Sequence, residues 1–238
     1  MSGQLLKKIF GNTKITKYIY SIIFDLEFYI EKRKKQKNMK KYGIKTIEFI
    51  QNILNTTGKI FFFDMGTLLG IIREGHLLKH DIDIDVGMIV GSENEKEKIL
   101  SLLLLNNCKL QSKYIIEELG TVEISLLIND IKFDINYYYT DGDKSICYLM
   151  APSKAHDEFP NKIILNKNEG RVIKLSVPSI NEVSTTNVLG PNINIPNNPE
   201  EYLTNRYGVN WRIPDKKYKY WRGNSAEFTN LIIKKCDN

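Results

Sequence analysis

One stretch of the chain, Phe61 to Val90, restricts the fold and the chemistry more than any other segment. Its sequence, FFFDMGTLLGIIREGHLLKHDIDIDVGMIV, predicts a strand, a tight turn, a short helix, a loop and a second strand with three alternating aspartates. Side chains on a strand alternate between its two faces, so Asp81, Asp83 and Asp85 are expected to project to one side. The aliphatic residues between them would then face a core.

These three carboxylates predict a cation site. Spread along about 14 Å of strand, they repel one another unless a cation or a binding partner lies among them. Hard divalent cations prefer oxygen ligands, and Mg²⁺ is usually held by one or two carboxylates together with substrate phosphates. The alternative is the solvated face of an edge strand, although edges are more often protected by lysine or proline.

The segment between the two strands contains a Gly-Thr pair. Gly66 suits the tight turn from strand to helix, and Thr67 would open a helix whose free N–H groups attract phosphate. A Gly-Thr pair alone is weak evidence. Together with the downstream Asp-Ile-Asp on the neighbouring strand, it indicates phosphoryl chemistry of the nucleotidyltransferase type.

Composition narrows the class of protein. A chain of 238 residues with 42% hydrophobic and 26% charged residues is typical of one substantial globular domain with an appendage. Residues 32–41 contain seven Lys or Arg and no acid, so the rest of the chain carries −1 of the net +6 charge. This local concentration disfavours nucleic acid as a partner. Cys108, Cys147 and Cys236 lack the close-paired spacing of disulfide frameworks or zinc sites.

The N-terminal part, residues 1–57, is predicted to be a helical extension of a catalytic domain over residues 58–238. One hypothesis is peripheral contact of residues 1–41 with an anionic membrane surface, where each nearby Lys or Arg contributes about 1 kcal/mol. The alternative is a helix packed on the domain with a solvated charged face. We find no apolar run of about 18 residues and no secretory h-region, and expect a cytoplasmic protein, at the inner face of the membrane if the extension binds lipid.

Downstream of the aspartates, the pattern predicts a mixed arrangement of helices and strands. Ser92 and Glu95 form a capping box at the start of a helix, and Asn198 caps another that ends at Gly208. Residues 151–200 are expected to hold loops, short strands and a substrate lid. Strands are expected over residues 110–116, 121–128, 131–139 and 145–150.

In the strand over 131–139, polar and apolar residues alternate. Lys132, Asp134 and Asn136 share one face, opposite a face of aliphatic and aromatic residues. Asp134 is therefore a candidate third metal ligand beside Asp83 and Asp85. The alternative for a single aspartate in a strand is a plain exposed residue.

Two blocks of sequence resemble the LicD/fukutin-related family. The first is Asp64-x-Gly66-Thr67-Leu68-Leu69-Gly70-x-x-Arg73-x-Gly75, followed by Asp81-x-Asp83-x-Asp85. The second, near the C-terminus, is Pro-x-x-x-x-Tyr202-Leu203-x-x-Arg206-Tyr207-Gly208-x-x-Trp211. Lys79-His80 stands where the family usually has a large residue, and Asn168-Glu169-Gly170 is a reduced form of another family element; both differences bear on acceptor recognition.

The resemblance implies an α+β fold, a nucleotidyltransferase-like mixed sheet flanked by helices. It also implies transfer of phosphocholine, ribitol phosphate or glycerol phosphate from a CDP-activated donor to a hydroxyl of a cell-surface glycan. A lipid-linked glycan is one form that this acceptor could take. Asp83, Asp85 and Asp134 would hold Mg²⁺, or Mn²⁺ in its place. Other matches to the family pattern give candidate donor-binding residues, namely Asp64, Gly66, Thr67 and Arg73.

Three points stay open at the level of sequence. Asp134 or Asp81 could accept the proton of the acceptor hydroxyl. Arg73 could pair with a phosphate or form a structural salt bridge. Two other classes share some of these features: a nucleotidyltransferase that acts on RNA or a small acceptor, and a non-catalytic scaffold at the membrane.

Overall fold

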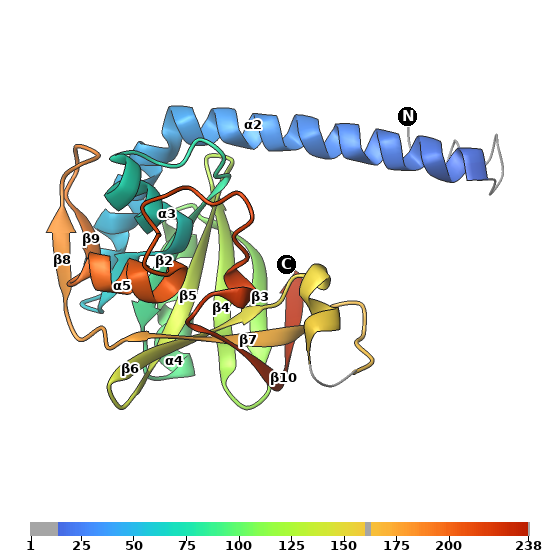
Figure 1. Cartoon of the computed structure of the whole chain (residues 1–238). Helices are drawn as coiled ribbons and strands as arrows, with labels where there is room; N and C mark the ends of the chain where they lie inside the picture. Colours follow the sequence, from blue (N-terminus) through green and yellow to red (C-terminus); the bar gives the residue numbers. More distant parts are fainter. Residues whose placement is uncertain (1–13, 160–162, 238) are drawn as a thin grey trace.

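The computed structural model describes residues 14–159 and 163–237. It confirms the predicted α+β class: helices flank one eight-stranded mixed sheet (Figure 1). The strands are β1 (Phe61–Phe63), β2 (Asp83–Ile89), β3 (Lys109–Ile116), β4 (Gly120–Ile128), β5 (Ile131–Asp141), β6 (Lys144–Met150), β7 (Glu169–Pro178) and β10 (Ala226–Asp237), with β8 (Val183–Thr186) and β9 (Ile193–Pro196) in a separate pair. The helices are α2 (Lys14–Asn55), α3 (Met65–Leu69), α4 (Glu93–Leu105) and α5 (Pro199–Tyr207), with short helical turns η1 (Gly70–Glu74), η2 (Ser153–Glu158) and η3 (Tyr220–Arg222).

The strand order is β1-β2-β5-β4-β3-β10-β7-β6, and β5 also pairs with β6. The sheet therefore curls until it closes on itself. The first part of β5 lies parallel to β2, whereas its last residues, from Tyr139 to Asp141, pair with β6. This curled sheet supplies the wall on which the acidic residues lie.

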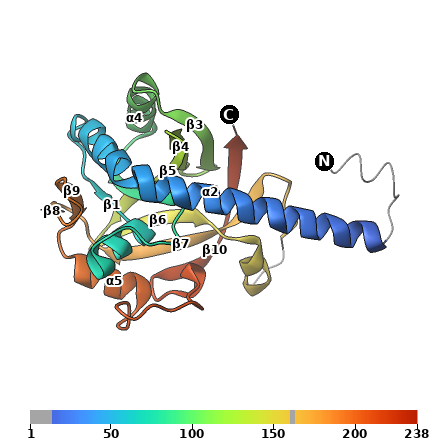
Figure 2. The ribbon, with the colours of Figure 1, turned by 90° about the horizontal axis from the view of Figure 1, so that it is seen from above.

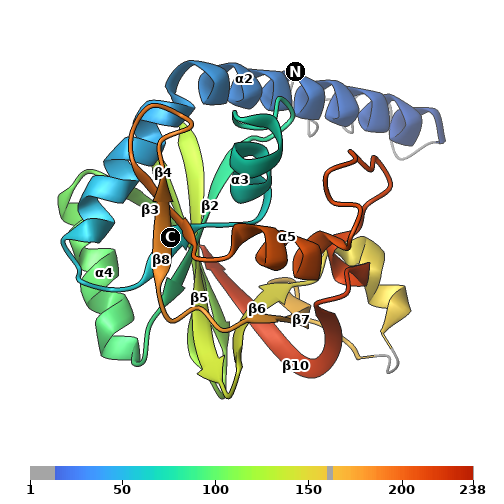
Figure 3. The ribbon, with the colours of Figure 1, turned by 60° about the vertical axis from the view of Figure 1, so that its left-hand side comes forward.

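The two faces of the sheet are covered by different helices. On one face, α4 and the C-terminal part of α2 pack on a core that includes Ile50, Leu54 and Phe133. On the other, α3 and α5 pack on a second core around Phe62 and Tyr138. Figure 3 shows α4 and α5 on either side of the central strands.

Helix α2 is a single helix of 42 residues, and its N-terminal half extends beyond the rest of the molecule (Figures 1 and 2). Several large apolar side chains of this half are exposed, whereas Ile47 and Ile50 in the C-terminal half are fully buried. No helix in the described residues combines the length and apolar character that a membrane crossing requires. Residues 1–13 of the expected helical extension lie outside the described part of the chain.

Local sequence signals explain most of the strands and helices around the site. The predicted capping box of Ser92 and Glu95 opens α4, and Asn198 caps α5. Asn129 and Asp130, both with positive φ, form the two-residue turn from β4 to β5. Gly87 of β2 leaves room for the ring of Phe62, since a Cβ atom there would lie 2.3 Å from that ring's Cζ.

Three local expectations are wrong. Strand β2 begins at Asp83, so Asp81 lies in the loop before the strand instead of on it. The tight turn falls on Met65, with a φ of 46°, and helix α3 is capped by Asp64, so Thr67 lies within the helix and does not open it. The region over 151–200 contains the short strands β8 and β9, but it also contains β7, a strand of ten residues in the main sheet. The side chains of β7, including that of Arg171, are mostly buried.

Candidate active site

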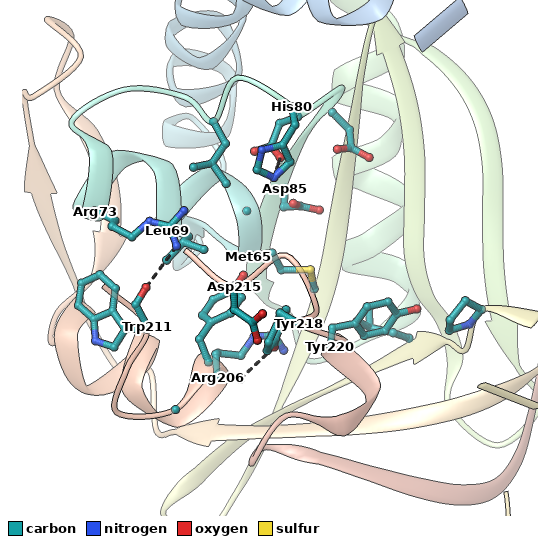
Figure 4. A pocket seen from close by; sticks show the side chains of 18 of the residues that line it. Met65, Leu69, Arg73, His80, Asp85, Arg206, Trp211, Asp215, Tyr218 and Tyr220 are labelled. Atoms are coloured by element: carbon teal, nitrogen blue, oxygen red, sulfur yellow. Dashed lines mark hydrogen bonds and ion pairs between the residues drawn. The ribbon is translucent and has the colours of Figure 1, made fainter. Parts of the chain in front are cut away.

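A cavity of about 1540 Å³ opens beside the start of β2 and β5. Its walls come from α3, η1, the loop before β2, strands β2 to β6, the end of α5 and the segment that follows α5. Figure 4 shows part of this lining, with Arg73, Asp85 and Arg206 around the same space. The charged residues of the lining that matter below are Arg73, Asp81, Asp83, Asp85, Glu123, Asp134 and Arg206.

The parallel pairing of β2 and β5 brings the predicted metal ligands together. In this register Asp85 is opposite Asp134, and Asp83 is opposite Lys132. Asp134 is buried, and its carboxylate accepts hydrogen bonds from Ser125 Oγ and Lys132 Nζ, each at 2.5 Å. The Lys132 ammonium also lies 4.0 Å from the carboxylate of Asp83. One lysine thus stands among several carboxylates.

Burial and the neighbouring carboxylates both raise pKa values in this cluster. Burial, together with the nearby Asp83 and Asp134 carboxylates, raises the pKa of Asp85 well above its ordinary value. Burial and the Asp134 carboxylate likewise raise the pKa of Asp83, against the opposing effect of Lys132. Carboxylates that are costly to ionise alone become favourable ligands when a cation neutralises them.

The donor chemistry of this cluster fits Mg²⁺, which binds carboxylate oxygens. In residues 14–159 and 163–237, however, no three His, Cys, Asp or Glu side chains are arranged to hold one ion as they stand. Lys132 accounts for part of this, because its ammonium occupies the side of Asp134 that faces Asp83. For Asp83, Asp85 and Asp134 to share a metal ion, Lys132 would have to move away from Asp134.

Asp81 lies at the edge of the cavity, before the strand. Its carboxylate is 3.8 Å from His80 Nε2, and its side chain is 17% exposed. Burial, with a contribution from Asp83, raises the pKa of Asp81 to about 7, while Arg73 opposes that shift. Gly66 allows this close approach, since a Cβ atom there would lie 3.2 Å from Asp81 Oδ2.

Two of the four expected donor-binding residues do not line the cavity. Asp64 is fully buried, where its carboxylate accepts hydrogen bonds from the Met65 N–H and the hydroxyls of Tyr138 and Tyr202. Thr67 is buried as well, and its hydroxyl accepts a hydrogen bond from the Asp85 N–H at 3.0 Å. These contacts hold α3 against β2. Asp64 and Thr67 therefore support the cavity wall through buried hydrogen bonds.

Arg73 does line the cavity, with its guanidinium already engaged. Its Nε donates to Glu74 at 2.8 Å, and Nη1 donates to the Trp211 carbonyl at 3.2 Å. The second contact joins η1 to the segment after α5, as Figure 4 shows. Arg73 therefore forms a salt bridge with Glu74, and its pairing with a phosphate stays a prediction.

The structure adds two charged residues that the sequence reading left unassigned. Glu123 on β4 pairs in register with Asn136 on β5, and burial together with Asp134 raises its pKa to about 8. Arg206 comes from α5 and is 3% exposed. The polar alternation of Glu123 and Ser125 would have placed Glu123 on the face of Asp134. No local pattern indicates which way Arg206 points, because that depends on how α5 docks.

We expect the metal-free protein to lose stability as pH rises through the titration of Asp81. The pKa of the Asp81 carboxyl is near 3.9 in the unfolded chain and about 7 in the folded protein. Between these values the folded state binds more protons, so its free energy of unfolding falls as pH increases. Thermal unfolding at pH 5 and pH 8 should show a smaller pH-dependent loss for Asp81→Asn than for wild type. The exposed Asp143→Asn is the matched control; equal losses in all three proteins would contradict the assignment.

A mixed sheet with an acid-lined cavity beside two parallel strands is the architecture expected of a nucleotidyltransferase-type domain. The family model described as LicD/FKTN/FKRP, nucleotidyltransferase domain, matches residues 58–198. The chain therefore belongs to the LicD/FKTN/FKRP family, as its sequence blocks predicted. The segment after Asn198, which contains Arg206 and Trp211, lies outside that match.

The chain is also similar to curated relatives. It is 25% identical over 181 residues to "Ribitol-5-phosphate transferase FKTN" of Macaca fascicularis, which covers 74% of this chain and 34% of that protein. The proteins of the same name from Homo sapiens and Mus musculus are 24% and 23% identical, over 74% and 79% of this chain and 34% and 35% of their own lengths. This chain thus spans about a third of the length of the curated relatives it matches.

Proposed function

We propose that this protein transfers a phospho-alcohol from a CDP-activated donor to a hydroxyl of a cell-surface glycan and releases CMP. The observation that carries the proposal is the group of Asp83, Asp85 and Asp134 on neighbouring strands, at the wall of a cavity of about 1540 Å³. Family membership and the ribitol-5-phosphate transferase relatives support the same class of reaction. Ribitol phosphate, phosphocholine and glycerol phosphate are the candidate groups.

The carboxylates Asp83, Asp85 and Asp134 would hold Mg²⁺, with Mn²⁺ as a substitute. Bound there, the metal would supply neutralisation of the charge on the donor's pyrophosphate. Lys132 supplies one positive charge to the cluster and would exchange its contact with Asp134 for one to solvent or ligand. Thr67 fixes the backbone of Asp85, because its hydroxyl accepts that residue's N–H.

Asp81 is the better candidate for accepting the proton of the acceptor hydroxyl. The carboxylate of Asp134 already accepts hydrogen bonds from Ser125 and Lys132. Asp81 lies ahead of the strand at the cavity wall, with His80 at 3.8 Å beside it. A general base must lie within reach of the proton it removes, and Asp81 has the less occupied carboxylate.

A thermal-shift screen in Mg²⁺ tests the donor. A ligand that binds the folded state raises the unfolding temperature by mass action. The screen compares CDP-ribitol, CDP-choline, CDP-glycerol, CTP and ATP, each with wild type and Asp83→Asn. A metal-dependent shift with one CDP-alcohol, absent in Asp83→Asn, supports the proposal. Shifts with CTP or ATP alone favour a nucleotidyltransferase that acts on RNA or a small acceptor, and no shift favours the scaffold.

We further propose that the N-terminal half of α2 contacts an anionic membrane surface, at the cytoplasmic face where a lipid-linked acceptor would be presented. Tyr18, Ile22, Leu26 and Tyr29 are each about half exposed or more and recur at helical spacing on one face. The basic run over 32–41 follows directly and would attract anionic lipid headgroups.

Co-sedimentation with vesicles tests this contact. Wild type should sediment with phosphatidylserine-containing vesicles at low salt, less at high salt, and little with phosphatidylcholine alone. The double variant Ile22→Asp, Leu26→Asp should lose most of the bound fraction. Leu105→Asp, at a position 82% exposed on α4, should bind like wild type. Absence of wild-type binding at low salt would refute the membrane contact.

A further inference from the structure

Arg206 carries a buried positive charge with free hydrogen-bond donors. Its side chain is 3% exposed, and neither Nε nor Nη1 has a hydrogen-bond partner in the described part of the chain. A guanidinium is always protonated and has five N–H donors in a fixed plane. An unpaired buried donor is costly, so native structures rarely keep one without a reason. Arg206 also lines the cavity (Figure 4).

The nearby carboxylate does not satisfy this guanidinium. Asp64 is close enough to act on Arg206 electrostatically. Its oxygens, however, accept hydrogen bonds from the Met65 N–H, Tyr138 and Tyr202. Asp64 therefore balances the charge of Arg206 only electrostatically. The Nε and Nη1 donors have no acceptor among the described residues. A phosphate that reached the guanidinium from the cavity would provide acceptors for both donors.

The position of Arg206 in the cavity indicates which anion. The same cavity is lined by Asp83, Asp85 and Asp134, which repel a bare anion and suit a metal ion instead. Arg206 faces this cavity from α5, and its planar fork matches the paired oxygens of a phosphate group. Arg73, by contrast, already donates to Glu74 and to the Trp211 carbonyl.

We propose that Arg206 binds a phosphate group of the donor's pyrophosphate in the cavity that the acidic cluster also lines. This inference rests on the proposed function, since it takes a nucleoside diphosphate ester as the ligand. It assigns a binding role to α5, which the family match does not cover. Loss of even one charge-assisted hydrogen bond predicts roughly a 10- to 100-fold loss of affinity, which is the minimum expected for this guanidinium.

The test uses the full chain and its Arg206→Met and Arg206→Lys variants, with CDP and inorganic pyrophosphate as probes in Mg²⁺. Isothermal titration should show Arg206→Met binding both probes about 10- to 100-fold more weakly, and Arg206→Lys in between, because an ammonium lacks the fork. Without ligand, Arg206→Met should unfold at the same temperature as wild type or higher, because an unsatisfied buried charge is removed. Arg212→Met, an exposed residue paired with Glu200, is the control and should change neither result.

Two outcomes overturn the inference alone. Wild-type affinity for CDP and pyrophosphate in Arg206→Met would show that the guanidinium does not touch the phosphates. The other outcome is a large fall in the unfolding temperature of ligand-free Arg206→Met that Arg206→Lys does not show, while both variants bind the probes as wild type does. It would show that Arg206 acts as a structural counter-ion of Asp64. Failure of wild type to bind either probe would instead count against the proposed function and remove the inference with it.

Discussion

Asp83→Asn lowers turnover about a thousandfold or more while leaving the fold intact, if the acidic cluster holds the catalytic metal. Loss of a ligand carboxylate removes several kcal/mol of transition-state stabilisation, and each 1.4 kcal/mol is about tenfold in rate. The side chain is 35% exposed, so an amide of the same shape should fit without disturbing β2. Initial rates with the donor found in the thermal-shift screen, at saturating Mg²⁺, measure the effect.

The control for this prediction is Asp143→Asn, which changes an exposed carboxylate outside the cavity. It should retain the rate and the unfolding temperature of wild type. Asp83→Asn with more than a tenth of wild-type turnover would show that Asp83 is not a metal ligand. An unfolding temperature well below that of wild type would attribute any loss of rate to misfolding instead.

Asp64→Ala is expected to lower the free energy of unfolding by about 3–5 kcal/mol. The fully buried carboxylate accepts three hydrogen bonds, from the Met65 N–H at 2.6 Å, Tyr202 at 2.5 Å and Tyr138 at 2.7 Å. Removing it leaves all three donors unpaired in the core and takes the cap from α3. Urea unfolding followed by circular dichroism measures the loss.

Graded variants identify the cause of that loss. Tyr202→Phe removes one donor and keeps the ring, so it should cost about 1–2 kcal/mol. Asp64→Asn keeps one acceptor oxygen and should cost less than Asp64→Ala. If Asp64→Ala were as stable as wild type, the hydrogen-bonded group of Asp64, Tyr138 and Tyr202 would not stabilise the contact between α3, β5 and α5.

Much of the fold follows from short-range patterns. The two-residue turn at Asn129-Asp130, the capping box at Ser92 and the caps of α5 are set by neighbouring residues, and the structure has each of them. The alternation of polar and apolar residues along β5 predicted that Asp134 lies on the polar face of that strand. The family assignment from the two sequence blocks is confirmed by the match over 58–198. The metal, donor and acceptor stay predictions.

The remaining features depend on contacts between distant parts of the chain. The register that sets Asp85 opposite Asp134 arises from the packing of β2 on β5, and single-strand alternation does not determine it. The sequence motif predicts that Asp64 binds the donor, whereas the structure shows its carboxylate bonded to the buried hydroxyls of Tyr138 and Tyr202. Strand β10 went unpredicted, because its exposed residues do not alternate as those of a half-buried strand do.

The closed sheet has a consequence for synthesis on the ribosome. Strand β10 lies between β3 and β7, and Ile116 pairs with Ile233, far along the chain. Until β10 emerges from the exit tunnel, β3 presents an unpaired edge, while β4 and β5, which carry Glu123 and Asp134, are already complete. Such long-range pairing slows folding and exposes edges to other chains. Nascent chains of this protein should therefore depend on chaperones until β10 has been made.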